Sequence, residues 1–183
     1  MVQAGSMGVP FIGVRGLLGS DILRHRADLR VVENPFQETE SVVVAQPIRP
    51  DVAVFHAIRA DRLGNSLVPG AVRDDLMMAR AGRWVVVTTE EIVDKEIKPE
   101  EAGIHTLLPA VDVDQIALAP FGAHPGSCHY SHDPVHIQEY MEAAREERSF
   151  KTYLDKYVFG LRNHQEYLAL VGLKPQGKQG ETA

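Results

Sequence analysis

The sequence has few of the features that mark secreted, membrane or nucleic-acid-binding proteins. It contains one cysteine, Cys128, so no disulfide can form within the chain, and a reducing, cytoplasmic setting is expected. It has no run of about 18 apolar residues and no basic and apolar N-terminal signal. The formal charge of −6 disfavours broad nucleic-acid binding, which needs clustered Lys and Arg. We therefore expect a soluble protein with no membrane and no nucleic-acid partner.

The length suits one ordinary domain. A chain of 183 residues can bury roughly 70% of its unfolded surface without disulfide or metal staples. Asp133 followed by Pro134 is typical of a helix start, and a helical region continues through Arg148, with further helices after it. Gly172 ends the last of these helices. The sequence thus predicts a single domain over 1–172 and a flexible tail over 173–183.

Three apolar segments predict the centre of the fold. Residues 52–57, 84–87 and 113–119 are predicted strands, and the first of them is a nearly continuous apolar run, which is typical of parallel strands buried on both faces. Residues 72–81, between the first two, are long and regular enough for a helix. This βαβ pattern predicts an α/β fold with a parallel sheet and C-terminal helices.

Polar residues follow each predicted strand. Open α/β sheets bind ligands beyond the carboxyl ends of their strands, so these positions are candidate binding residues if the strands are neighbours. Glu90 and Glu91 follow the second strand, and a partly buried Glu90 with a raised pKa could act as a general base. Glu90 is thus the candidate catalytic residue. The candidate binding residues are His56, Asp61, Gly64, Asn65, Gly122 and His124.

Most of these residues also have a structural explanation. Gly64 and Asn65 are common in tight turns that bind no ligand. Asp61 could pair with a neighbouring arginine, and His56 could be hydrogen-bonded within the core. The negative charge of Glu90 could simply favour a helix N-terminus. The residues alone leave these alternatives open.

Two further sequence patterns are weaker evidence for a binding site. His and Cys residues gather between positions 124 and 136, but a helix start at Asp133 separates His132 from His136, so the two do not share a metal-binding helix face. No metal ion is expected. The glycine-rich segment 13–19 could cradle a phosphate or only turn the chain.

Six short motifs follow one another along most of the chain. They are Arg15–Asp21 (RGLLGSD), Asn34–Phe36 (NPF), Pro50–His56 (PDVAVFH), Ala60–Asn65 (ADRLGN), Val86–Val93 (VVTTEEIV) and Gly122–Pro125 (GAHP). In this order the motifs resemble the A subunit of family I CoA-transferases, and within that family the glutaconate CoA-transferase branch.

The resemblance implies a three-layer α/β/α fold with an open, mainly parallel sheet. It also implies a B-subunit partner, in a heterotetramer or larger assembly, with acyl-CoA and a carboxylic acid as substrates and no permanently bound cofactor. In this family a glutamate attacks the thioester, which gives an anhydride and then a glutamyl-CoA thioester. That glutamate lies in an S-E-N-G motif on the B subunit, which this chain lacks. Glu33 and Asn34 match only two of its letters, so Glu33 is not proposed as the nucleophile.

The resemblance also predicts an incomplete subunit. The family's A subunits have a further N-terminal segment with a glycine-rich loop that stabilises the thioester oxyanion, and this chain resembles only the part that follows it. A sheet without its first strands exposes an edge and apolar surface, so the chain is expected to need another polypeptide. Two other functions stay open: a CoA-transferase-like hydrolase acting on a cyclic ketone CoA thioester, as in steroid-ring degradation, and a non-catalytic partner-binding subunit.

Overall fold

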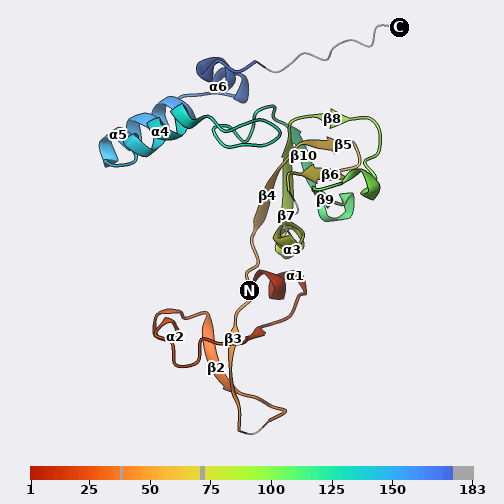
Figure 1. The fold of residues 1–183 in the computed structure, drawn as a ribbon, viewed down its shortest axis with the longest axis vertical. Helices are drawn as coiled ribbons and strands as arrows, with labels where there is room; N and C mark the ends of the chain where they lie inside the picture. Colours follow the sequence, from red (N-terminus) through yellow and green to blue (C-terminus); the bar gives the residue numbers. More distant parts are fainter. Residues whose placement is uncertain (38, 71–72, 175–183) are drawn as a thin grey trace.

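The fold is elongated, and small sheets lie along its length. A computed structural model describes residues 1–37, 39–70 and 73–174. In these residues an antiparallel sheet lies at one end of the long axis, a parallel sheet lies in the middle beside a mixed sheet, and helices lie at the other end (Figure 1). No helix in these ranges is long and apolar enough to cross a membrane.

The parallel sheet positions the candidate site. Its strand order is β10–β7–β4, so β7 lies in the middle. The strands are β4 (Val52–Ala57), β7 (Trp84–Thr89) and β10 (Gln115–Leu118). Both pairings are parallel, with His56 opposite Thr88 and Ala117 on the other side of Thr88. The predicted α/β class and mainly parallel sheet are confirmed, and the carboxyl ends of all three strands meet at one edge.

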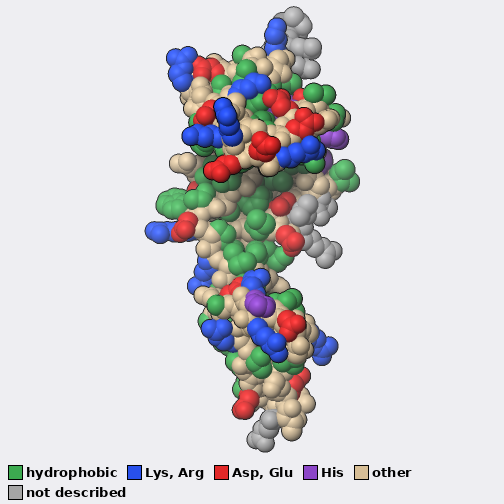
Figure 2. Space-filling model, turned by 90° about the vertical axis from the view of Figure 1, so that its left-hand side faces the viewer, with side chains coloured by type: hydrophobic (Ala, Val, Ile, Leu, Met, Phe, Trp, Pro, Cys, Tyr) green, Lys and Arg blue, Asp and Glu red, His purple; other side chains and the backbone are tan. Residues whose placement is uncertain are grey.

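One face of this sheet is buried and the other is largely exposed. Helix α3 (Arg73–Ala81) and the mixed sheet cover the buried face, where Phe55 and Val87 join the main hydrophobic core. The predicted helix start at Val72 lies outside the described residues. On the opposite face Val54 is 65% exposed and Trp84 54% exposed. Figure 2 shows hydrophobic side chains gathered across the middle of the molecule, at the level of this sheet. Because parallel sheets are normally covered on both faces, this surface is unusual.

The mixed sheet has the order β8–β5–β6–β9 and was not predicted. Its strands are β5 (Arg59–Asp61), β6 (Ser66–Val68), β8 (Ile92–Val93) and β9 (Thr106–Leu108), and the 3-10 turns η1 (Pro99–Glu101) and η2 (Ala110–Asp112) flank β9. Strands of two or three residues are too short to show a period of two, so the sequence gives no signal for them. The chain thus leaves the parallel sheet after β4 and returns through α3.

The N-terminal sheet was also not predicted. It is antiparallel, with the order β1–β3–β2, and has its own small core of Leu29, Val43 and Ala45. Its strands are β1 (Ile12–Val14), β2 (Leu29–Glu33) and β3 (Ser41–Ala45). A short helix, α2 (Ile22–His25), follows the glycine-rich segment 13–19. Helix α1 (Val2–Ser6) packs against α3 and links this sheet to the rest.

The C-terminal region is helical, as predicted. It contains α4 (Pro134–Ala143), α5 (Glu147–Leu154), the π-helical turn η3 (Asp155–Phe159) and α6 (His164–Val171). Asp133 caps α4 by accepting from two backbone N–H groups, and Gly172 ends α6 with a φ of 75°. The region expected to be helical through Arg148 is broken between α4 and α5, whose Tyr140 and Phe150 rings pack 6.0 Å apart. Most of the predicted tail, 175–183, lies outside the described residues.

Candidate functional site

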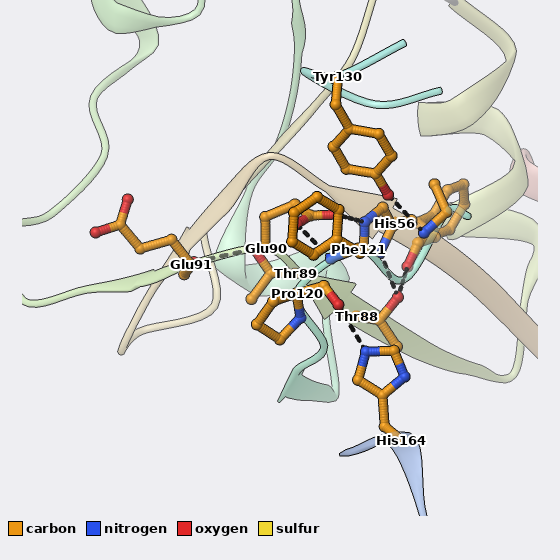
Figure 3. A network of polar contacts seen from close by, with 11 residues as sticks. His56, Thr88, Thr89, Glu90, Glu91, Pro120, Phe121, Tyr130 and His164 are labelled. Carbon is orange, nitrogen blue, oxygen red and sulfur yellow. Dashed lines mark hydrogen bonds and ion pairs between the residues drawn. The ribbon is translucent and has the colours of Figure 1, made fainter. Parts of the chain in front are cut away.

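A histidine and a glutamate meet at the carboxyl edge of the parallel sheet. His56 Nε2, from the end of β4, lies 2.7 Å from Oε1 of Glu90, which directly follows β7. Their side chains are 17% and 6% exposed. Glu90 Oε2 accepts a hydrogen bond of 2.6 Å from the backbone N–H of Phe121, which follows β10 (Figure 3). Glu90 therefore connects the ends of all three strands.

The hydrogen bonds around His56 place a proton in this pair. The Thr88 hydroxyl lies 2.9 Å from His56 Nδ1 and 3.2 Å from the carbonyl oxygen of Phe55. The hydroxyl has one proton, so it donates a hydrogen bond either to the carbonyl oxygen of Phe55 or to Nδ1. In both cases a proton lies between Nε2 and Glu90 Oε1, because two lone pairs 2.7 Å apart would repel each other. The pair is thus a dyad that shares a proton. The Thr88 hydroxyl holds its imidazole, and the backbone N–H of Phe121 holds its carboxylate.

Two more polar side chains lie around the dyad and stay protonated. Tyr130 accepts a 3.1 Å hydrogen bond from the backbone N–H of Ala123, and its ring packs 5.0 Å from that of Phe121. Burial, and then the negative charge of Glu90, raise the pKa of the Tyr130 phenol. Burial also raises the pKa of the Cys128 thiol, with a further contribution from Glu90. A thiol is nucleophilic only as the thiolate, so Cys128 is not activated here.

The same neighbourhood offers metal-ligating atoms. Ligand atoms of His56, Glu90 and Cys128 lie within 4.8 Å of one another. Two ligands of a tetrahedral zinc ion lie roughly 3.3 Å apart, since each is about 2.0–2.2 Å from the metal. The 2.7 Å contact between His56 and Glu90 is shorter and has the geometry of a direct hydrogen bond. We therefore interpret the group as a hydrogen-bonded dyad beside a thiol.

The loop after β10 is held tightly against the dyad. Phe121 has a φ of 56°, which is rare for a residue other than glycine, and its N–H is bound by Glu90. At Gly122, a Cβ atom would lie 2.7 Å from His56 Cε1 and 2.8 Å from the carbonyl oxygen of Ala119. His124 lies further along the loop, with Nδ1 2.7 Å from the Tyr167 hydroxyl. Glycine is thus required next to the imidazole.

Replacing Gly122 with Ala is expected to lower the free energy of unfolding by about 1–3 kcal/mol and to displace His56. The added methyl group meets a backbone oxygen that cannot move freely. The matched control is Gly13→Ala, where a Cβ would lie 3.6 Å from Val42 and no positive φ is required. Urea unfolding and the NMR signals of the His56 ring measure both effects. Equal stability of the two variants would contradict this account of the loop.

Asp61, Gly64 and Asn65 form a separate turn. Asp61 is 1% exposed, and its carboxylate accepts from backbone N–H groups within the turn and from the Asn65 side chain. Gly64 has a φ of 111°, and Asn65 Oδ1 accepts from Ala110 N–H at 2.9 Å. Asp61 also accepts from Ile97 N–H at 2.9 Å, so the side-chain hydrogen bonds that Asp61 and Asn65 form with described residues go to the turn itself, to Ile97 and to Ala110, and none of them goes to the dyad. The structure thus brings together His56, Glu90, Gly122 and His124, whereas the role predicted for the turn in binding stays a prediction.

A surface pocket of about 450 Å³ opens beside the dyad. Thr88, Phe121 and Gly122 line one part of it. Residues of α5, η3 and α6 line another part, among them Tyr153, Tyr157 and Tyr167. These tyrosines were not among the candidate binding residues predicted from the sequence. Their shared position beside the strand ends depends on tertiary packing that no local pattern shows.

Comparison with known proteins identifies a family. Residues 1–119 match the family model described as Coenzyme A transferase. The chain is 30% identical over 190 residues to the A subunit of glutaconate CoA-transferase from Acidaminococcus fermentans, with 94% of this chain and 59% of the relative covered. It is 32% identical over 170 residues to the A subunit of 3-oxoadipate CoA-transferase from Pseudomonas knackmussii, with 92% and 59% covered. The chain thus spans about three fifths of the length of these relatives.

Solved structures give the same picture. Glutaconate CoA-transferase from Acidaminococcus fermentans matches with a TM-score of 0.83 and 28% identity, covering 93% of this chain and 59% of that chain. A variant of the decarboxylase AibA/AibB matches with a TM-score of 0.66 and 36% identity, covering 84% of this chain and 56% of that chain. Similar folds thus occur in proteins named for different reactions.

Proposed function

Because this chain belongs to the coenzyme A transferase family, we propose that it is a subunit of an acyl-CoA:carboxylate CoA-transferase. The family match carries this proposal, since residues 1–119 include both His56 and Glu90. The similarity in fold to glutaconate CoA-transferase supports it. The proposed substrates are an acyl-CoA and a carboxylic acid, and CoA itself is a substrate rather than a bound cofactor.

We propose that the nucleophilic glutamate comes from a partner B subunit. Glu90 is the carboxylate nearest the strand ends, but its side chain is 6% exposed and both oxygens are hydrogen-bonded. A carboxylate held in this way is a poor nucleophile for a bulky thioester. In the proposed reaction the partner's carboxylate attacks the thioester carbonyl and releases CoA thiolate. The thiolate then attacks the glutamyl carbonyl of the anhydride, which forms glutamyl-CoA and frees the first acid.

Transfer is completed by the same steps in reverse order with the second acid. Its carboxylate attacks glutamyl-CoA and forms a new anhydride, and the released CoA thiolate then attacks the acyl carbonyl of that acid. The new acyl-CoA leaves, and the glutamate is regenerated without any net consumption of water. His56 and Glu90 act in this scheme as positioning residues, because they hold Phe121 and Gly122 beside the pocket.

The exposed face of the parallel sheet supports the need for a partner. Val52, Val54 and Trp84 are each at least 50% exposed on adjacent strands, where a soluble protein gains by covering apolar surface. The relatives are named as A subunits, which fits a B subunit for this chain. We propose a heterotetramer or larger assembly in the cytoplasm.

The test is a CoA-transfer assay on the complex recovered with this chain tagged. With labelled CoA in a panel of acyl-CoA donors, label is expected in acetyl-CoA when acetate is the acceptor. Intact-mass measurement is expected to show an adduct of CoA minus one water on the partner and none on this chain. An adduct on this chain would contradict the nucleophile assignment.

The same assay separates the alternatives. Free CoA released without an acceptor acid would indicate a hydrolase, and loss of carbon dioxide from the acyl group would indicate a decarboxylase. A complex that contains a partner and shows no turnover with any donor would indicate a non-catalytic subunit.

A further inference from the structure

The pocket beside the dyad has a polar mouth and aromatic walls. Thr88 and Gly122 lie where it meets the strand ends, next to His56. Phe121 and the tyrosines of the C-terminal helices form the walls. With a volume of about 450 Å³, the pocket is within the usual range of roughly 300–1,000 Å³ for small-molecule sites.

The polar atoms of these walls already have protein partners. The Tyr153 hydroxyl lies 2.8 Å from His136 Nε2, and the Tyr157 hydroxyl donates to Glu139 at 2.9 Å. His164 Nε2 donates to the carbonyl oxygen of Pro120 at 2.6 Å. Together with the contact between His124 and Tyr167, these bonds leave mainly ring surfaces for a ligand. Such surfaces favour apolar ring groups that pack against aromatic rings.

Among the described residues of these walls, no lysine or arginine is available to hold a second carboxylate. Burial raises the pKa of Tyr153, and it raises the pKa of Tyr167 to about 12, so both phenols stay neutral. None of the described lining residues is Lys or Arg. The nearby Lys156 is paired with Glu139 at 3.2 Å and lies over the Tyr157 ring.

An acidic group also lies close to the pocket. Asp133 Oδ2 is 3.3 Å from His124 Nε2. Hydrogen bonding to backbone N–H groups, chiefly that of His136, outweighs burial and lowers the pKa of Asp133, which therefore stays charged at neutral pH. A second carboxylate in the pocket would meet this negative charge.

We infer that this pocket binds the part of the acyl group distal to the thioester, and that it selects an uncharged, ring-bearing acyl group such as benzoyl or cyclohexanecarbonyl. This inference rests on the proposed function and names its substrate class. It separates this chain from relatives named for glutaconate and 3-oxoadipate, both of which are dicarboxylates. The thioester would lie toward Thr88 and Gly122, and the ring would lie among the tyrosines.

The first experiment compares acyl-CoA donors on the purified complex. We expect kcat/KM for benzoyl-CoA and cyclohexanecarbonyl-CoA to exceed that for glutaryl-CoA by about tenfold or more. Transfer with glutaryl-CoA preferred would overturn the inference and leave the proposed function intact. If no donor reacts, the proposed function fails, and the second experiment decides about the pocket by itself.

The second experiment measures binding without turnover. Benzoate and glutarate are titrated separately into the complex, and the tyrosine ring signals are followed by NMR. Benzoate is expected to shift the signals of Tyr153 and Tyr167, whereas glutarate leaves them unchanged. Shifts caused by glutarate alone, or by neither acid, would overturn the inference.

A charge placed in the pocket should change its selectivity. Val158 lines the pocket and is 53% exposed, so Val158→Lys is compatible with the fold. We expect this change to raise kcat/KM for glutaryl-CoA relative to benzoyl-CoA by about tenfold. The matched control is Val135→Lys, at a residue on α4 that is 76% exposed and does not line the pocket. An unchanged ratio in Val158→Lys, or an equal change in both variants, would contradict the inference.

Discussion

Replacing Asp61 with Ala is expected to lower the free energy of unfolding by about 3–5 kcal/mol, because it removes the acceptor of five buried or partly buried hydrogen bonds. Oδ1 accepts from the N–H groups of Leu63, Gly64 and Asn65 at 2.9–3.0 Å. Oδ2 accepts from the Asn65 side chain at 2.7 Å and from Ile97 N–H at 2.9 Å. These donors would be left without partners where Asp61 is 1% exposed.

The loss should also depend on pH. Burial alone would raise the pKa of Asp61, but hydrogen bonds from Ile97 and Asn65 outweigh it and lower the pKa. A lowered pKa in the folded state means that the ionised group stabilises the fold above the unfolded pKa of about 3.9, and that this stability is lost as the pH falls through the folded pKa. The difference in free energy of unfolding between wild type and Asp61→Ala is therefore largest at pH 7 and decreases below about pH 4.

Urea unfolding at several pH values measures this difference. The matched control is Asp21→Ala, because the Asp21 side chain is 83% exposed and pairs only with the exposed Arg24. Its effect should lie within about 0.5 kcal/mol. If Asp61→Ala unfolded at the same urea concentration as Asp21→Ala, the structural role of the carboxylate would be disproved.

The structure around Asp61 could be predicted only in part from local sequence patterns. Gly64 and Asn65 indicated a turn, and the apolar segment before them indicated a buried strand, and the structure contains both. The acid was interpreted as a ligand-binding residue or as the partner of an arginine. Its hydrogen bonds go to the turn and to Ile97, which is 36 residues away in the sequence, and its role in ligand binding stays a prediction. A hydrogen bond between residues so far apart depends on the mixed sheet, whose strands are too short to be predicted from sequence periodicity.

The candidate site could be predicted in part for a similar reason. The rule that parallel strands share a carboxyl edge was sufficient to group His56, Glu90 and Gly122, because it needs only strand direction and neighbourhood. It could not indicate that the imidazole and the carboxylate bond directly, since a shift of one residue in register would turn either side chain to the other face. Nor could it indicate the aromatic pocket, whose walls come from helices that fold back from the C-terminal region.

Replacing Glu90 with Ala is expected to reduce kcat/KM for CoA transfer by about a hundredfold or more, since displacement of a site loop by about 1 Å can have that effect. The change removes the acceptor of the Phe121 N–H bond and the partner of His56 at the same time. Phe121 holds a left-handed backbone conformation, so the loop is expected to relax once this bond is lost.

Glu90→Gln distinguishes positioning from acid–base chemistry. Its amide oxygen can accept from Phe121 N–H, and its amide nitrogen can donate to His56 Nε2, so the loop keeps its place. If Glu90 acts by positioning, Glu90→Gln should keep kcat/KM within about tenfold of wild type over the whole pH range. If Glu90 were a general base, Glu90→Gln would be as inactive as Glu90→Ala, and the pH profile of the wild-type activity would change in the variant.

The matched control is Glu91→Ala. Glu91 is the next residue in the chain and points away from the dyad in Figure 3, and its side chain is exposed. It carries the same charge, so any general electrostatic effect on CoA binding should appear there too. Activity near wild type in Glu91→Ala, together with a large loss in Glu90→Ala and its recovery in Glu90→Gln, would assign the loss to the hydrogen bonds of one carboxylate. Thermal unfolding of each variant separates that result from loss of the fold.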